Sequence, residues 1–163
     1  MRRREATRMA RHPAWDSAEA RALIEARRDQ KGAMLPILHD LQERFGYVDD
    51  EAIPLIASTL NVSRAETLGV IAFYHDFRRA PVDKPVLKLC RAESCQAAGC
   101  EDLVAHLESR HGLRAGSHGG AVELETVYCL GHCAASPAAM LDGEPMAGLT
   151  RESLDAVLAE VAR

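Results

Sequence analysis

The sequence predicts an α/β protein in which a small all-α helical domain precedes a four-stranded mixed sheet with flanking helices. The first half of the chain shows only helical periodicity, whereas the second half follows the order strand, helix, strand, hairpin, helix. Between them, RRAPVDKP (78–85) is charged, contains two prolines and lacks periodicity, as linkers do. We therefore expect a helical domain at 1–80 and a second domain at 81–163.

Four amphipathic helices are expected in the first domain. Asp16 with Glu19 and Ser63 with Glu66 have the spacing of a capping box at a helix start. Apolar residues at helical spacing extend each pattern. The expected helices cover 16–30, 33–45, 51–60 and 64–75. The fourth ends in the apolar and aromatic run GVIAFYHDF, which we interpret as core; packing on the second domain or on a partner is the alternative.

Residues 1–15 are expected to form a basic arm. The run MRRREATRMAR is arginine-rich, but Glu5 and Asp16 break the acid-poor pattern of a transit peptide, and no secretory h-region is present. No apolar run approaches the roughly 18 residues that a membrane span needs. We interpret the arm as solvated, with docking on a partner subunit as the alternative, and expect a cytoplasmic protein without direct membrane insertion.

The second domain is expected to contain two parallel strands. The first strand covers 86–90 and is followed by a helix at 97–111, and the second strand covers 122–128. A hairpin turns at Asp142–Gly143, the pair preferred in type I′ turns, and a last helix covers 151–162. A strand–helix–strand unit implies a parallel, right-handed crossover. The simplest closure is a four-stranded mixed sheet, close to a thioredoxin-like fold.

Two close pairs of cysteines dominate the second domain. Four residues separate Cys90 from Cys95, three separate Cys129 from Cys133, and each pair follows one of the two strands. Because the carboxyl ends of parallel strands meet at one edge of a sheet, four thiolates can converge there. The spacings favour a [2Fe–2S] cluster, and a four-thiolate zinc site stays open as the alternative. The sequence has no Cys-x-x-Cys redox motif and no plant-type or Rieske pattern.

The composition indicates a globular protein and argues against nucleic-acid binding and disulfides. The chain has 163 residues, of which 47% are hydrophobic and 27% charged, as in globular proteins. Residues 81–163 carry 7 lysines and arginines against 12 aspartates and glutamates, a net charge of −5, which argues against nucleic-acid binding. Five cysteines without an export signal indicate a reducing compartment, where disulfides are disfavoured.

Two separated blocks of sequence resemble one known family. LCRAESCQAAG, followed by VYCLGHCAASPAAMLDGEPMAGLT, is similar to the thioredoxin-like [2Fe–2S] subunits of NADH-linked oxidoreductases. The helical stretch GAMLPILHDLQERFGYVDDEAIPLIASTLNVSRAETLGVIAFYHDF resembles their N-terminal domain. These subunits include the thioredoxin-like subunit of respiratory complex I and the gamma subunit of NAD-dependent formate dehydrogenase. The resemblance covers roughly residues 20–160, and CRAESCQ with the short C-terminus is most similar to the formate dehydrogenase gamma subunit.

The resemblance implies four cluster ligands, Cys90, Cys95, Cys129 and Cys133. Cys100 falls where the family usually has a small residue, and we interpret it as a buried helix residue. His132 lies between two ligands; we interpret it as a loop residue, with tuning of the cluster potential as the alternative. The other six histidines show no ligand spacing and are expected at the surface or in packing.

The function implied by the resemblance is electron transfer. Four thiolates leave no open coordination position on a cluster, and the sequence shows no catalytic residues and no dinucleotide fingerprint. A partner subunit with FMN and NAD, contacted by both domains, is implied. In formate dehydrogenase, which converts formate and NAD+ to CO2 and NADH, a further catalytic subunit carries a molybdenum or tungsten centre. The alternatives are the corresponding subunit of complex I or of another NADH-linked oxidoreductase, a free-standing ferredoxin and a zinc-stabilised helical adaptor.

Overall fold

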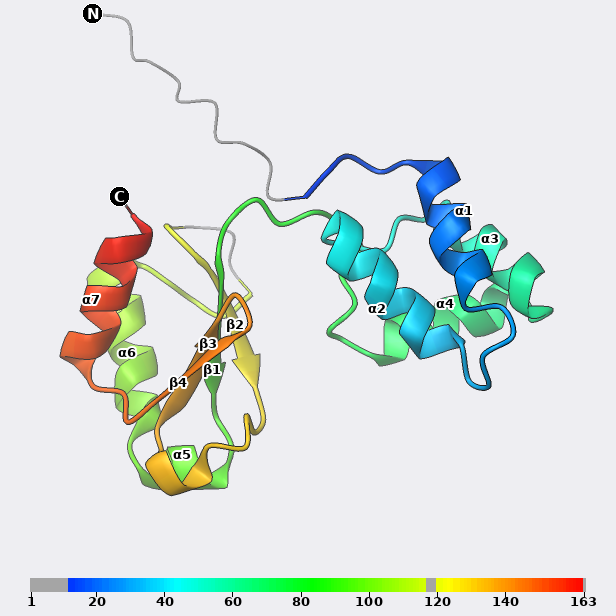
Figure 1. Cartoon of the computed structure of the whole chain (residues 1–163). Helices are drawn as coiled ribbons and strands as arrows, with labels where there is room; N and C mark the ends of the chain where they lie inside the picture. The colour runs from blue at the N-terminus through cyan, green and yellow to red at the C-terminus, as the bar shows by residue number, and fades with distance from the viewer. Residues whose placement is uncertain (1–11, 117–119, 163) are drawn as a thin grey trace, which may run out of the picture. The chain divides into compact units, whose positions relative to one another are not determined.

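The computed structural model describes residues 12–116 and 120–162, so most of the expected basic arm at 1–15 lies outside the described residues. The chain forms two compact units, Met1–Asp83 and Lys84–Arg163. The first contains helices only, and the second combines a sheet with helices (Figure 1). This architecture confirms the predicted fold class.

Four helices make up the first unit: α1 (Ser17–Ala26), α2 (Met34–Phe45), α3 (Ala52–Leu60) and α4 (Arg64–Phe73). Their apolar stripes meet in one core, where Leu38, Leu41, Phe45 and Ile56 are fully buried. Burial of this stripe is what stabilises helices that are too short to persist alone.

The helix starts and ends follow most of the predicted signals; α1 differs at both ends, and α4 ends at Phe73 rather than at residue 75. Ser63 and Glu66 form the expected capping box at the start of α4. Asp16 caps α1, but Glu19 turns away from the cap and pairs with Arg44 of α2 at 2.7 Å. The helix also ends at Ala26 rather than near residue 30.

The aromatic tail of α4 is not the plain core that we predicted. Phe73 is 76% exposed, and Leu68 and Tyr74 are each 42% exposed, whereas Ile71 is buried. Only one side of this short helix packs on α3. Because consecutive residues of the run are apolar, the apolar side chains on its other sides remain exposed to solvent.

The second unit contains a four-stranded mixed sheet in the order β2-β1-β3-β4. Its strands are β1 (Val86–Cys90), β2 (Glu123–Val127), β3 (Ala138–Leu141) and β4 (Glu144–Ala147). As predicted, β1 and β2 are parallel, and β3 and β4 form an antiparallel hairpin. Asp142 and Gly143 both have positive φ, at 50° and 91°, as a type I′ turn requires.

The helix expected at 97–111 begins three residues later, and a separate short helix precedes it. A short helix α5 (Glu93–Ala97) precedes α6 (Cys100–His111). Gly99 between them has a φ of 87°, in the left-handed region that a continuous helix cannot contain. The break lets α5 remain beside the end of β1 while α6 runs back along the sheet.

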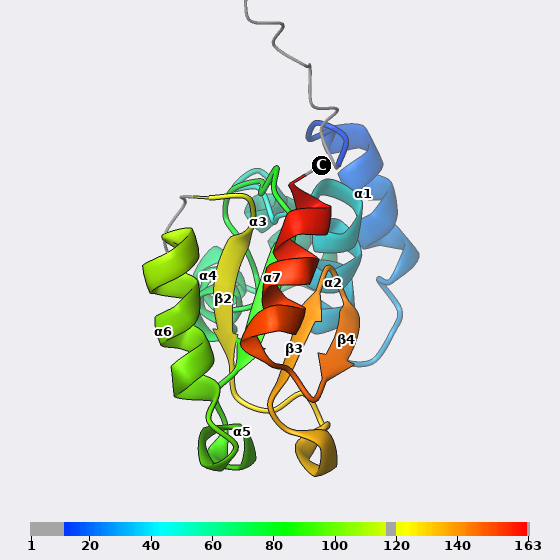
Figure 2. The same ribbon diagram turned by 90° about the vertical axis from the view of Figure 1, so that its left-hand side faces the viewer.

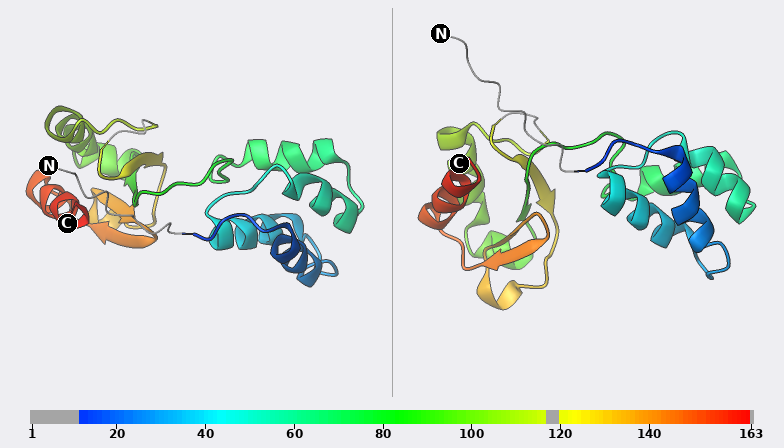
Figure 3. Two further views of the ribbon diagram at one scale, coloured as in Figure 1. Left: turned by 90° about the horizontal axis from the view of Figure 1, so that it is seen from above. Right: turned by 45° about the horizontal axis from the view of Figure 1, so that its top comes forward.

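Helices α6 and α7 (Arg151–Val161) lie on the same side of the sheet (Figures 1 and 3). Their apolar residues Leu107 and Leu154 are buried against Leu87 and Leu124 of the strands. This packing closes the core of the second unit. In the described parts of the chain, no helix is long and apolar enough to cross a membrane.

A polar cluster also joins α6 to α7. Nε2 of His106 and Nε2 of His111 lie 2.7 and 2.6 Å from Oδ1 of Asp155, whose Oδ2 lies 3.0 Å from Nε of Arg110. Hydrogen bonds from His111 and His106 lower the pKa of Asp155 to about 2.

Candidate metal centre

The four paired cysteines follow the carboxyl ends of β1 and β2. Cys90 ends β1 and lies opposite Val127, the last residue of β2, while the Arg91 N–H donates to the Val127 carbonyl at 2.9 Å. Cys95 lies in α5, Cys129 lies two residues beyond β2, and Cys133 opens the 3₁₀ helix η1 (Cys133–Ala135). Helix α5 and the η1 segment lie at the same end of the sheet (Figure 2).

The two cysteines after β2 have the spacing of ligands on one metal ion. Their Sγ atoms lie 3.8 Å apart. Two thiolates bound about 2.3 Å from a tetrahedral ion lie about 3.8 Å from each other. Both side chains are exposed, and the N–H of Gly131 donates to Cys129 Sγ at 3.4 Å. This N–H···S bond is the kind that stabilises an anionic metal–thiolate centre.

The two cysteines after β1 are buried. Cys90 is 3% exposed and Cys95 is 2% exposed, in a small apolar cluster with Ala138 and Val127. Burial raises the pKa of Cys90, but hydrogen bonds to its sulfur, from backbone N–H groups and the Cys95 thiol, outweigh it and leave that pKa below its ordinary value. The N–H groups belong to Ala92, Cys129 and Leu130.

An unusual backbone conformation brings the second loop over the first cysteine. Cys129 has a φ of 95°, in the left-handed region that residues with a side chain rarely adopt. The N–H groups of Cys129 and Leu130 then point at the Cys90 sulfur. The strained residue therefore links the two cysteine pairs.

Two serines tie the cysteine loops together. Ser94 Oγ donates to the Cys133 carbonyl at 3.0 Å and lies 2.9 Å from Ser136 Oγ. Ser136 Oγ also lies 3.6 Å from Cys95 Sγ. Sequence reasoning missed these serines, because nothing in their spacing marks them as neighbours.

The sulfurs are close enough to oppose one another's ionisation. The hydrogen bond that Cys133 shares with Cys129 and the negative charges of the Cys129, Cys95 and Cys90 thiolates raise the pKa of Cys133. Four thiolates at one place therefore need a cation to stabilise them. Burial of one cysteine pair, an N–H donor to sulfur and the position of both pairs at one end of the sheet fit a metal–sulfur centre.

Cys100 and His132 are placed as their interpretation predicted. Cys100 is fully buried at the first turn of α6, and burial raises the pKa of its thiol. His132 is an exposed loop residue that immediately precedes η1.

A family model for thioredoxin-like [2Fe–2S] ferredoxins matches residues 20–162. The chain belongs to this family. The cofactor of the thioredoxin-like [2Fe–2S] ferredoxins is a [2Fe–2S] cluster, so membership favours the cluster over the zinc site that the cysteine spacing left open.

Curated proteins with related sequences agree with this assignment. NADH-quinone oxidoreductase subunit 2 of Thermus thermophilus is 32% identical over 133 residues, which are 80% of this chain and 74% of that protein. A subunit of the NADH-quinone oxidoreductase of Escherichia coli K12 is 31% identical over 132 residues, 80% of each chain.

A solved structure shares the fold. The crystal structure of an air-oxidised NAD+-reducing [NiFe]-hydrogenase has a TM-score of 0.66 at 22% identity. The likeness covers 83% of this chain but only 24% of the hydrogenase chain.

Proposed function

We propose that this ferredoxin-family chain is a one-electron carrier subunit of an NAD-linked oxidoreductase, with its cluster on Cys90, Cys95, Cys129 and Cys133. The observation that carries the proposal is the position of the two cysteine pairs at the carboxyl ends of the neighbouring parallel strands β1 and β2. When bound, such a cluster accepts and releases single electrons. The names of the curated relatives, NADH-quinone oxidoreductase subunits, support this class of complex.

The chain's own residues would hold and orient the centre asymmetrically. Cys90 and Cys95 lie in an apolar cluster that excludes water, while Cys129 and Cys133 are exposed. Tyr128, next to Cys129, is 75% exposed. A redox partner therefore approaches most closely from the side of Cys129, and we expect Tyr128 to contact it.

We propose NAD-dependent formate dehydrogenase as the parent complex and the cytoplasm as its location. The resemblance of CRAESCQ to the formate dehydrogenase gamma subunit supports this choice. A flavin- and NAD-binding subunit would contact both units of this chain, and a molybdenum or tungsten subunit would complete the enzyme. The corresponding subunit of complex I fits the curated relatives equally well.

Metal analysis and spectroscopy of the anaerobically purified chain test the cofactor and its ligands. We expect two irons per chain, a brown colour and a rhombic EPR signal after reduction. Serine at any of the four ligand positions should abolish or shift the visible spectrum, whereas Cys100→Ala should leave it unchanged. One zinc without iron would instead support the zinc-stabilised adaptor, and unchanged spectra in all four serine variants would refute the ligand set.

Pull-down of the tagged chain from its native cells, followed by mass spectrometry, tests the parent complex. A flavoprotein together with a molybdenum- or tungsten-containing subunit supports formate dehydrogenase. Recovery of membrane subunits of a quinone reductase supports complex I instead. Recovery without any flavoprotein would favour the free-standing ferredoxin.

A further inference from the structure

A second cluster of potential metal ligands lies apart from the cysteines, between α6 and α7. His106 lies within α6, His111 is its last residue, and Asp155 lies in the second turn of α7. One nitrogen from each imidazole and one oxygen of the carboxylate all lie within 4.8 Å of one another. We propose that these three side chains form a site for a divalent transition-metal ion, with Zn²⁺ as its preferred occupant.

The donor set suits zinc. Two imidazole nitrogens and one carboxylate oxygen are ligands that Zn²⁺ takes in three-ligand protein sites, where a water completes the tetrahedron. Both histidines direct Nε2 at the same atom, Asp155 Oδ1, at 2.7 and 2.6 Å. The lone pairs of the two rings therefore converge once the Nε2 proton of each has moved to Nδ1, which gives the other neutral tautomer.

Only small side-chain movements would convert the hydrogen-bonded cluster into a metal-coordination site. Bonds of about 2.0–2.1 Å to a tetrahedral ion place neighbouring donor atoms about 3.3 Å apart. The two contacts to Asp155 Oδ1 would need to lengthen by less than about 1 Å to reach that separation, which side-chain rotation supplies. Metal coordination would then replace the two hydrogen bonds.

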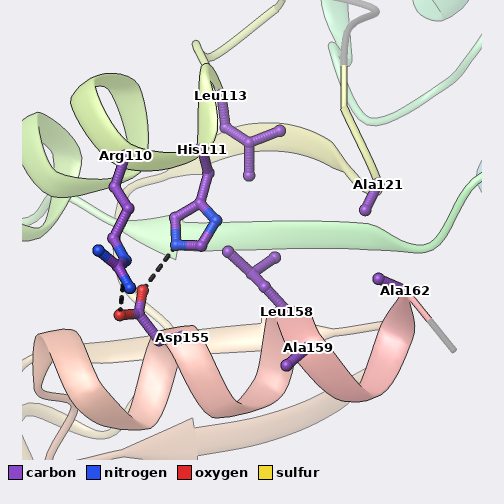
Figure 4. Close-up of a pocket in the computed structure, with 8 residues that line it drawn as sticks. All are labelled: Arg110, His111, Leu113, Ala121, Asp155, Leu158, Ala159 and Ala162. Carbon is purple, nitrogen blue, oxygen red and sulfur yellow. Dashed lines mark hydrogen bonds and ion pairs between the residues drawn. The ribbon is translucent and has the colours of Figure 1, made fainter.

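The surrounding residues hold the three ligands in place and leave room for a water molecule as the fourth ligand. Leu107 and Leu158, each near a ligand residue, are buried in the core that joins the two helices. A cavity of about 400 Å³ borders His111 and Asp155 (Figure 4). The ligand side chains are 14%, 24% and 30% exposed for His106, His111 and Asp155, so the ion can enter from solvent.

Arg110 both supports and weakens the proposed site. Its Nε lies 3.0 Å from Asp155 Oδ2, which fixes the carboxylate with Oδ1 turned toward the histidines. Its positive charge opposes a cation, but the Arg110 side chain is 64% exposed, so water screens that charge. The alternative to a metal site is that the four residues form only an ion-pair cluster between the helices.

The test uses the chain with its cysteine site loaded, so that added zinc meets filled thiolate positions. Isothermal titration calorimetry with ZnCl₂ should show one saturable equivalent. Asp155→Asn, which keeps the shape of the side chain, and His111→Gln should each weaken binding at least about tenfold. His75→Gln, at an exposed histidine in the turn after α4, is the control and should bind as the wild type does.

X-ray absorption at the zinc edge identifies the ligands independently of any activity. We expect only nitrogen and oxygen neighbours at about 2.0–2.1 Å, and no sulfur at about 2.3 Å. Zinc should also raise the unfolding temperature of the wild type but not of Asp155→Asn, because an ion that binds only the folded state stabilises it. Sulfur neighbours, absence of saturable binding, or equal affinity in the variants would overturn the site. None of these results depends on whether the chain transfers electrons.

Discussion

Arg91 and Glu101 form a two-pronged ion pair beside the cysteine site. Nε and Nη2 of Arg91 lie 2.8 and 2.7 Å from the two carboxylate oxygens of Glu101. Arg91 follows Cys90 directly, and Glu101 lies in the first turn of α6. The pair therefore fixes the loop that begins at Cys90 to the helix that begins at Cys100, and hydrogen bonding to Arg91 lowers the pKa of Glu101.

We expect Glu101→Gln to increase the rate at which the cluster is lost, several-fold, without preventing its assembly. The amide cannot hold the guanidinium by charge, so the loop after Cys90 should open more often and admit water or chelator. The measurement is the decay of visible absorbance under a strong iron chelator. Glu108→Gln, which breaks the ion pair with Arg114 at the other end of the same helix, is the control. Equal decay rates in the two variants would show that the pair does not protect the site.

Leu154→Ala should destabilise the second unit by about 2–5 kcal/mol, because Leu154 is fully buried between α7 and the sheet and its truncation leaves a cavity. Hydrogen exchange of the β1 amides reports the free energy of unfolding of this unit. Leu68→Ala, at a position that is 42% exposed, should change stability by no more than about 0.5 kcal/mol. A loss below about 1 kcal/mol for Leu154→Ala would contradict this packing.

Thr150→Ala should lower the free energy of unfolding by about 1 kcal/mol, because it removes the side-chain cap at the start of α7. The Thr150 hydroxyl accepts from the Ser153 N–H at 3.2 Å, and the Ser153 hydroxyl accepts in turn from the Thr150 N–H at 2.9 Å. Removing the hydroxyl leaves one donor of the first turn without its partner. Chemical denaturation measures the loss. Thr150→Ser keeps the hydroxyl and should lie within a few tenths of a kcal/mol of the wild type.

The capping box of α4 should make stability depend on acid pH. The backbone N–H of Ser63 donates to Glu66, which lowers the pKa of Glu66 below its ordinary value. A carboxyl group with a lowered pKa in the folded state adds stability that is complete above its unfolded pKa and is lost as pH falls through the lowered value. Wild type should therefore be more stable than Glu66→Gln near neutral pH, and the difference should shrink in acid.

Nuclear magnetic resonance of the Glu66 carboxyl carbon measures that titration directly. We expect a midpoint below that of a glutamate in an unfolded peptide, and Ser63→Ala should move the midpoint upward because the hydroxyl that supports the box is gone. A wild-type midpoint at or above that of the peptide would contradict the hydrogen bond.

Local sequence rules determined most of the elements. The Ser63–Glu66 cap and the Asp142–Gly143 turn could both be predicted from the sequence, because each depends on a few neighbouring residues. The parallel pairing of β1 and β2 followed from the order strand, helix, strand. The positions of the cysteine pairs at the ends of these neighbouring strands, and with them the candidate site, could therefore be predicted from the sequence.

The tertiary structure decided what depends on contacts between distant residues. The left-handed backbone at Gly99 and Cys129, the exposure of Phe73 and the serine contacts between the cysteine loops have no signature in local spacing. The same holds for His106 and His111, which the sequence left as ordinary surface or packing residues. They meet a carboxylate far along the chain only because two helices pack on the same face of the sheet. Which distant residues come into contact depends on how many buried side chains pack together, and no short sequence motif determines that packing.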